Sequence, residues 1–304
     1  MISRMLIMAA SVSGLPPVGS GQAIFGYGYS GSGRLSMTNL VSNTGVVSND
    51  TAGVGTARNA LAAASYGGDK AIFGYGNDGN NSSLTNLVSN TGVVANDTAG
   101  VGTARYALAA ASFGTDKAIF GYGGTSALAM QSLTNLVSNT GVVSSDTAGV
   151  GTARYILAAA SYGTDKAIFG YGYAGGYVSL TNLVSNSGTV ATDTTGVGTD
   201  RRALAAAAYG TDKAIFGYGT DGSNQLSMTN LVNNSGGVAS DVTGVGTARQ
   251  LLAAAGYGGD KAIFGYGFDN NYVSLTNLVS NTGVVSTDTA GVGTARYGLA
   301  AASF

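Results

Sequence analysis

The sequence predicts an all-β fold built from six tandem repeats, and three observations carry this prediction. The hexapeptide AIFGYG recurs at intervals of 47 to 49 residues, beginning at Ala23, Ala71, Ala118, Ala167, Ala214 and Ala262. The apolar segments between these copies have the length of strands, and none has the length and period of a helix. Glycine, asparagine and aspartate stand at fixed places between the segments, as hairpin turns require.

Each repeat contains four segments that we expect to be strands. In the third repeat they are ARYALAAASF (104–113), DKAIFGYG (116–123), SLTNLVSN (132–139) and GVVSSDTAG (141–149). Short strands joined by tight turns indicate antiparallel pairing. Four strands in a repeat of this length match one blade of a β-propeller. The sequence therefore predicts a six-bladed β-propeller of four-stranded antiparallel blades.

The ends of the chain decide how such a ring would close. Residues 295–304 repeat the inner-strand segment closely, whereas residues 3–11 repeat it only weakly. We therefore expect the C-terminal strand 295–304 to close a propeller of residues 22–304, leaving residues 1–21 as an arm or a diverged inner strand. The competing closure places the N-terminal strand, with Arg4 and Met5, inside the ring. A secretory signal is a weaker interpretation, because the apolar run from Met5 to Ala10 is shorter than a signal core of about 7–15 residues.

The order of residues in one repeat resembles the kelch family of β-propellers. Arg105 heads the inner strand, an AAAS strand follows, and AIFGYG stands where kelch blades have an apolar strand ending in paired glycines. The chain departs from kelch in having Gly-Tyr-Gly and in lacking Trp in the outer strand. The resemblance implies a kelch-like propeller.

Two phrases, SLTNLVSNTGVV and DTAGVGTARY, are similar to tandem repeats in virion-associated proteins of tailed phages of marine and cyanobacterial hosts. This resemblance implies a virion or extracellular location. It also implies a tail, receptor-binding or decoration role.

Two positions vary between repeats while the rest scarcely changes. One is the stretch between GYG and the next Leu-Thr-Asn or Met-Thr-Asn, and the other is the residue after the inner-strand arginine. Because strands alternate in direction, both positions belong to one face of a propeller. Tyrosine, asparagine, aspartate, serine and glycine dominate there, as in adaptable recognition loops. Neutral drift of exposed loops is the alternative.

These variable positions supply the candidate ligand-binding residues. They are Tyr29, Arg34, Asn77, Asp78, Asn80, Tyr106, Tyr155, Tyr173, Tyr177, Arg202, Asp221, Asn224, Gln250, Phe268, Asp269, Asn270, Tyr272 and Tyr297.

The repeated charges predict a structural role instead. Each inner strand begins with an arginine and each outer segment carries an aspartate, and bidentate pairing would satisfy both charges. We expect these pairs to tie adjacent blades together. They are Arg58, Arg105, Arg154, Arg201, Arg249 and Arg296 with Asp50, Asp97, Asp146, Asp193, Asp241 and Asp288.

Composition narrows the classes of function. The net charge is −1 with no basic stripe, which argues against nucleic acid, and no apolar run approaches a membrane span of about 20 residues. G-x-G-x-x-G recurs four times, from Gly26, Gly74, Gly170 and Gly217, but each copy precedes a β segment, so a nucleotide site is not expected.

The chain has no His, Cys or Glu, so we expect no enzyme, no metal site and no cofactor. The remaining enzymatic alternative is an aspartate-based glycoside hydrolase using Asp78, Asp200, Asp221 or Asp269.

The sequence thus favours a non-enzymatic recognition or adhesion propeller that displays variable loops on one face. A surface glycan or host receptor is the expected partner, with other virion proteins as a further class. The alternative is a purely structural virion or scaffold propeller. The oligomeric state stays open.

Overall fold

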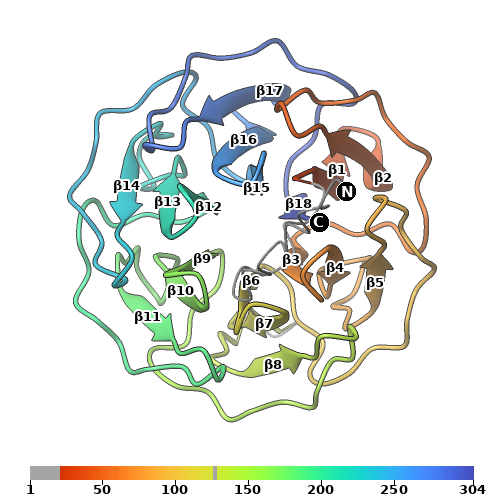
Figure 1. Cartoon of the computed structure of the whole chain (residues 1–304), viewed down its shortest axis with the longest axis horizontal. Coiled ribbons are helices and arrows are strands. Elements are labelled where there is room, and N and C mark those ends of the chain that lie inside the picture. Colours follow the sequence, from red (N-terminus) through yellow and green to blue (C-terminus); the bar gives the residue numbers. More distant parts are fainter. Residues whose placement is uncertain (1–20, 126–128) are drawn as a thin grey trace, which may run out of the picture.

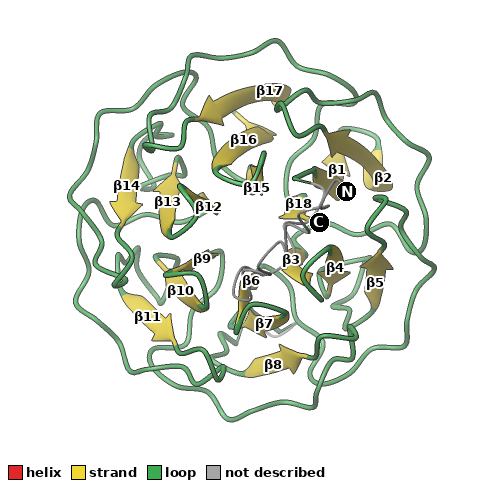
Figure 2. Ribbon diagram, viewed as in Figure 1, coloured by secondary structure: helices red, strands yellow, loops and turns green. Residues whose placement is uncertain are grey.

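The computed structural model describes residues 21–125 and 129–304, and the described chain is all β (Figure 2). It contains no helix that is long and apolar enough to cross a membrane. The arm or diverged strand predicted for residues 1–21, with Arg4 and Met5, lies outside the described residues except for Gly21.

Eighteen strands form six separate antiparallel sheets of three strands each within the described residues. We number them sheet 1 (β18-β1-β2), sheet 2 (β3-β4-β5), sheet 3 (β6-β7-β8), sheet 4 (β9-β10-β11), sheet 5 (β12-β13-β14) and sheet 6 (β15-β16-β17). The inner strands are β18 (Ala300–Ser303), β3 (Ala62–Tyr66), β6 (Ala109–Phe113), β9 (Ala158–Tyr162), β12 (Ala205–Tyr209) and β15 (Ala253–Tyr257). The middle strands are β1 (Ala23–Ser30), β4 (Lys70–Gly74), β7 (Lys117–Gly121), β10 (Lys166–Gly170), β13 (Lys213–Gly217) and β16 (Lys261–Phe268). The third strands are β2 (Gly33–Val41), β5 (Thr85–Val88), β8 (Thr134–Val137), β11 (Thr181–Val184), β14 (Thr229–Val232) and β17 (Tyr272–Val279).

The six sheets surround a common centre, with the inner strands nearest to it and the third strands farther out (Figure 1). Strand β18 from the end of the chain pairs with β1, with Ala23 opposite Ser303 and Gly26 opposite Ala300. This repeated architecture is compatible with a β-propeller-like fold.

The sheets have three strands, and not the four that the sequence predicts. The outer segment lies beside the third strand but touches it through two isolated bridges, such as Val41 with Val47 and Thr38 with Thr51. In all six sheets the strand asparagine donates from Nδ2 to a backbone carbonyl of the outer segment, as Asn39 does to Ser48 at 3.0 Å, so a side chain takes the place of a ladder bond. A segment rich in Ser, Asn, Asp and Gly has low strand propensity and accepts such side-chain bonds in place of a ladder.

The fixed hexapeptide packs each sheet against the next. Phe73 of sheet 2 lies over Gly26 of sheet 1, where an added Cβ would stand 2.6 Å from the ring. The ring of Phe73 also contacts that of Tyr27, with 5.1 Å between centroids. The same contact recurs at every boundary, including Phe25 over Gly265 between sheets 6 and 1. Only glycine leaves room for the phenylalanine, which explains why Phe-Gly is copied without change.

Small residues in the inner strands allow these strands to approach the centre closely. In β3, Ala62 and Ala64 are buried while Ala63 and Ser65 are half-buried. Serine hydroxyls join some neighbouring inner strands, as between Ser65 and Ser303, whose Oγ atoms lie 3.1 Å apart.

Candidate recognition face

The variable loops start from a rigid backbone turn at the end of each middle strand. In sheet 2, Tyr75 has a φ of 64°, in the left-handed region, and its ring is fully buried. Its hydroxyl donates to the carbonyl oxygen of Val101 at 3.1 Å, and the N–H of Gly76 donates to the carbonyl oxygen of Arg105 at 2.9 Å. A non-glycine residue adopts this φ only when its surroundings hold it there. The Gly-Tyr-Gly turn, which departs from the kelch pattern, thus fixes where each loop begins.

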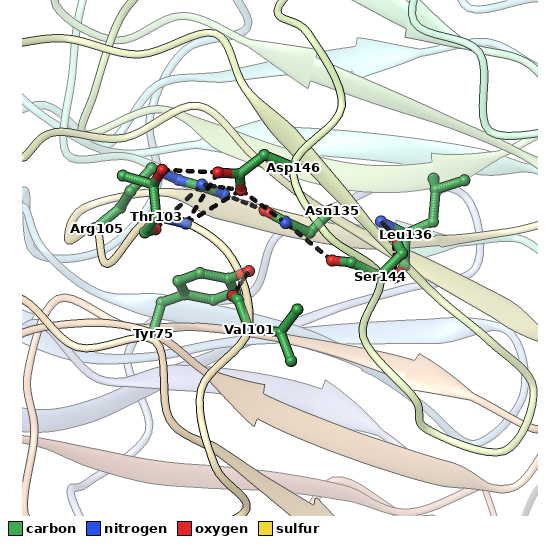
Figure 3. A network of polar contacts seen from close by, with 8 residues as sticks. All are labelled: Tyr75, Val101, Thr103, Arg105, Asn135, Leu136, Ser144 and Asp146. Atoms are coloured by element: carbon green, nitrogen blue, oxygen red, sulfur yellow. Dashed lines mark hydrogen bonds and ion pairs between the residues drawn. The ribbon is translucent and has the colours of Figure 1, made fainter.

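A buried polar network secures the head of each inner strand beside this turn (Figure 3). Arg105 is fully buried and donates from Nη2 to Asn135 Oδ1 at 2.6 Å and from Nη1 to Asp146 Oδ1 at 3.4 Å. Asp146 also accepts from the backbone N–H and the hydroxyl of Thr103 at 3.0 and 2.7 Å. The Arg105 guanidinium lies 4.8 Å from the ring centroid of Tyr75, which belongs to the preceding sheet. The buried guanidinium thus has a carboxylate as its counter-charge, although Asp146 itself is exposed to solvent and Arg105 Nε has no hydrogen-bond partner among the described residues.

The expected arginine–aspartate pairs are present, but they differ from the expectation in two respects. Each has a single Nη1–Oδ1 contact and is not bidentate, because Nη2 of the arginine is occupied by the strand asparagine. The contacts are Arg58–Asp97 and Arg105–Asp146 at 3.4 Å, Arg296–Asp50 at 3.7 Å, Arg154–Asp193 and Arg201–Asp241 at 3.8 Å, and Arg249–Asp288 at 3.9 Å. Both partners belong to the same sheet unit, so the contact to the neighbouring sheet comes from the tyrosine ring and not from the aspartate.

The network shifts the pKa values of its members. Partial burial works to raise the pKa of Asp146, but hydrogen bonds from Thr103 and Asn135 and the charge of Arg105 outweigh it, so the pKa lies below its ordinary value. Burial raises the pKa of Tyr75 to about 12, although the charge of Arg105 opposes the rise. The carboxylates are thus held charged and the phenols neutral, which suits structural anchors and not groups that exchange protons near neutral pH.

The two variable positions are joined to each other in every sheet. The residue after each inner-strand arginine forms an antiparallel bridge with the first loop residue of the same sheet. The bridges are Tyr297 with Tyr29, Asn59 with Asn77, Tyr106 with Gly124, Tyr155 with Tyr173, Arg202 with Thr220, and Gln250 with Phe268. Loops of neighbouring sheets also meet, for example where Arg34 Nη2 donates to Asn77 Oδ1 at 2.6 Å.

The next residue in each sheet continues this connection around the centre. Its N–H donates to the carbonyl oxygen of the equivalent residue in the preceding sheet, at 2.7 to 3.0 Å. The donors and acceptors are Ala60 to Gly298, Ala107 to Ala60, Ile156 to Ala107, Ala203 to Ile156, Leu251 to Ala203, and Gly298 to Leu251. All six residues have φ between 52° and 62°. The bonds form one cycle of six, which anchors the variable residue beside each donor to a common backbone ring.

Four aromatic rings gather where the loops of sheets 6 and 1 meet, and we call Tyr29, Phe268, Tyr272 and Tyr297 the four-ring patch. Tyr272 and Tyr297 stack with 8° between their planes and 5.5 Å between centroids. Tyr29 lies 5.7 Å from Tyr297, and Phe268 lies 5.9 Å from Tyr272. All four side chains are half-buried, so ring surface remains exposed to solvent.

A second aromatic group lies across sheets 3 to 5, and we call Tyr106, Tyr155, Tyr173, Tyr177 and Arg202 the arginine patch. Tyr106, Tyr155, Tyr173 and Tyr177 follow one another with 5.7 to 6.2 Å between successive centroids. The guanidinium carbon of Arg202 lies 5.1 Å from the centroids of both Tyr173 and Tyr177. These side chains are half-buried as well.

A polar cleft of about 510 Å³ opens between the loops of sheets 5 and 6, next to the four-ring patch. Its lining includes Thr220, Asn224, Gln225, Gln250, Asp269 and Asn270. With its amide oriented to satisfy both terminal atoms, Gln225 donates to the carbonyl oxygens of Ala248 and Phe268 at 3.1 and 3.2 Å. Amides, hydroxyls and one carboxylate therefore line the wall beside the exposed aromatic rings.

The loop of sheet 2 holds three further candidates, Asn77, Asp78 and Asn80, and has no aromatic side chain. Asp78 and Asn80 are exposed, and Asp78 Oδ1 accepts from the N–H of Asn80 at 3.0 Å. The buried amide atoms Asn59 Oδ1 and Asn81 Nδ2 have no hydrogen-bond partner. The structure thus brings most predicted residues into two aromatic groups and one cleft, and leaves Arg34, Asn77, Asp78, Asn80 and Asp221 outside them.

The carboxylates considered for hydrolysis close their own loops or contact a neighbouring hydroxyl. Asp221 Oδ1 accepts from the N–H groups of Asn224 and Ser223 at 2.7 and 2.8 Å, and these two bonds hold its pKa below the ordinary value. Asp200 accepts from the hydroxyl of Ser179 at 2.5 Å, and Asp269 from the N–H of Asn271 at 3.0 Å. Among the described residues no group of three or more His, Cys, Asp or Glu side chains is arranged to hold a metal ion.

Sequence reasoning missed two kinds of residue. The strand asparagines, such as Asn135, are the main partners of the buried arginines, and the signal was an unvarying Asn inside an otherwise apolar LTNLV strand. Gln225 and Thr220 line the cleft and stand in the variable loop of sheet 5, but nothing in that loop alone shows that it adjoins the loop of sheet 6.

No protein-family model matches this chain, and a search of curated proteins finds no match.

Proposed function

We propose that this protein is a six-bladed, kelch-like β-propeller that acts by recognition and not by catalysis, with a surface glycan as its ligand. Closure of the ring is supported by the pairing of β18 with β1 and by the cycle of six backbone hydrogen bonds. A phage virion or the extracellular medium is its proposed location, in a tail, receptor-binding or decoration role.

The observation that carries the proposal is the four-ring patch beside the polar cleft. Exposed tyrosine rings bind the apolar C–H faces of sugars, and amides, hydroxyls and carboxylates bind sugar hydroxyl groups. The Tyr272–Tyr297 stack and the cleft residues Gln250 and Asn270 supply both kinds of contact within one surface. Their backbone is fixed by the buried network, which lowers the conformational entropy lost on binding.

The test is a glycan array together with a host-cell binding assay, comparing the intact protein with two variants. In the first, all six variable loops carry the sheet 2 sequence NDGNNSS. In the second, Tyr272→Asn copies the residue that sheet 2 has at the same place, Asn81. We expect both variants to fold and to lose binding. Val93→Thr is the matched control, because Val93 is 65% exposed in a turn at the opposite edge of its sheet and sheet 4 has Thr189 there.

A purely structural role in a virion or scaffold is the second candidate, and one observation favours it. The turns after the third strands expose a valine in four consecutive sheets, at Val284, Val46, Val93 and Val142, each 65 to 66% exposed. Exposed apolar side chains at one edge suit contact with another protein. If the intact protein binds no glycan and no cell, while a Val46, Val93, Val142 and Val284→Thr variant loses incorporation into an assembly, this second role holds and recognition fails.

A further inference from the structure

We infer that the arginine patch binds the carboxylate of an acidic sugar residue, such as a uronic acid or a sialic acid. The inference rests on the proposed recognition of glycans and names the class of sugar for one of the two aromatic groups. The four-ring patch and its cleft would then take uncharged sugar residues of the same or another glycan.

The first step is the pairing of the positive charges. Within residues 21–125 and 129–304, every lysine and each of the six buried arginines forms an ion pair with an aspartate. Arg34 has no ion pair but donates to Asn77. Arg202 differs from all of these, since its guanidinium contacts two tyrosine rings and has neither a carboxylate within ion-pair distance nor a hydrogen bond to an acceptor in the described residues.

The second step is the rigidity of Arg202. Its backbone N–H donates to Thr220 at 3.0 Å, and its carbonyl oxygen accepts from Thr220 at 2.9 Å. The rings of Tyr173 and Tyr177 stand at 89° to each other, and the guanidinium lies 5.1 Å from both centroids. The guanidinium makes cation–π contacts with both rings but no hydrogen bond to the described residues, so its N–H groups remain available to bind a carboxylate in bidentate fashion. The side chain is half-buried, so a ligand can reach it while water screens it only partly.

The third step is the state of the acidic groups nearest in the chain. Asp200 stands two residues before Arg202 and accepts from Ser179, and Asp221 follows the bridge partner Thr220 and accepts from two loop N–H groups. Neither forms an ion pair with Arg202. Among the described residues the positive charge is therefore uncompensated, whereas the six arginines of the buried network are compensated sheet by sheet.

The fourth step is the shape of the surroundings. The Tyr155 and Tyr173 rings meet edge to face at 5.8 Å and 88°, so aromatic surface extends away from the guanidinium. A sugar ring with a carboxylate presents an anionic group and apolar C–H faces next to each other. The arginine patch offers a cation for the first and tyrosine ring surface for the second.

The experiment compares two matched pairs of probes by isothermal titration calorimetry. One pair is tetragalacturonate and its methyl ester, and the other is sialyllactose and lactose. The variant Arg202→Gln copies Gln250, which occupies the same position in sheet 6, and Tyr177→Asn copies Asn81 of sheet 2. Val93→Thr at the opposite edge of sheet 2 is the control, because Val93 is 65% exposed and lies in neither aromatic patch, and the melting temperature of each variant reports folding.

We expect the intact protein to prefer at least one acidic probe over its uncharged counterpart. Arg202→Gln should lower the affinity for that acidic probe by about 10- to 100-fold, the range of a charge-assisted hydrogen bond. The difference in affinity between the intact protein and the variant should shrink as the salt concentration is raised, because salt screens the charge. Val93→Thr should leave the acidic preference in place.

Three outcomes would overturn the inference: equal affinity for both members of each pair, an acidic preference that survives Arg202→Gln in a folded variant, or no binding of either acidic probe. If neutral glycans on the array still bind and need Tyr272, recognition by the face stands and only the assignment of the arginine patch falls. If no glycan or cell binds the intact protein, the proposed function fails as well.

Discussion

Arg201 and Arg202 are neighbours in the chain, yet they belong to two different regions of the molecule. Arg201 is fully buried over the ring of Tyr171 and donates to Tyr218, Asn230 and Thr199. Arg202 is half-buried over two tyrosine rings and donates to no acceptor in the described residues. The first position is arginine in every sheet, whereas the second is, in chain order, Asn, Tyr, Tyr, Arg, Gln and Tyr.

The comparison separates two demands on the sequence. A buried charge needs every partner in place, so the interior network must be repeated without change. The adjoining position needs only a backbone bridge, so its side chain can vary and be used for recognition. Changes to the interior should therefore alter stability, and changes to the face should alter binding alone.

Alkaline pH should have the largest effect on stability, because it ionises the buried tyrosines of the interior network. Burial raises the pKa of Tyr27, Tyr75, Tyr122, Tyr171, Tyr218 and Tyr266 to about 12, against about 10 in the unfolded chain. Between these values the unfolded chain loses protons that the folded chain keeps, so stability falls as pH rises through this window. Each tyrosine should lower the free energy of unfolding by about 2–3 kcal/mol, and the six together should unfold the protein. Circular dichroism and tyrosinate absorbance should change together, and a stepwise ionisation before unfolding would contradict the prediction.

Arg201→Gln should have the next largest effect. The substitution removes the donor to the buried Asn230 Oδ1 and to the carbonyl oxygen of buried Tyr218, which should lower the free energy of unfolding by about 1–3 kcal/mol for each group left unpaired. Denaturant unfolding measures it, with Arg202→Gln as the matched control one residue away. An equal effect of the two substitutions would remove the distinction between the two regions.

Gly217→Ala tests the apolar packing between two sheets against a glycine in a variable loop. An added Cβ would stand 2.7 Å from the ring of Phe264 in the next sheet, so the boundary must open, at a cost of about 1–3 kcal/mol. Gly176→Ala is the control, because its added Cβ meets no atom within 4 Å and it lies in the loop of sheet 4. Thermal melting of both proteins gives the difference, and a similar loss in both would show that the sheet boundary is not tightly packed.

Arg202→Gln should have the smallest effect on stability, within about 0.5 kcal/mol, because no interior group depends on this side chain. The free energy of unfolding from the same denaturant series measures it. A loss above about 2 kcal/mol would mean that Arg202 is part of the framework.

The repeat, the all-β class and the strand positions could be predicted because glycine turns and apolar segments are local signals. The outer segment was wrongly predicted as a fourth strand, since strand asparagines such as Asn39 bond its carbonyl oxygens through their side chains where a ladder was expected. The partner of Arg105 was wrongly assigned in part, because Asn135 competes with Asp146 for the guanidinium. The grouping of Tyr29 with Tyr272 depends on which sheets adjoin, and no local pattern encodes that.

The pairing of β18 with β1 has a consequence for how the chain acquires its structure during synthesis. Strands β1 and β2 leave the ribosome well before their inner partner, residues 300–303, is made. At about 5–20 residues per second, the gap of some 260 residues corresponds to roughly 13–50 s in which β1 exposes an unpaired edge. Such an edge attracts other strands. Each growing chain therefore exposes an edge on β1 that can pair with a strand of another chain. Swapped dimers of this protein should first appear between neighbouring chains on the same polysome.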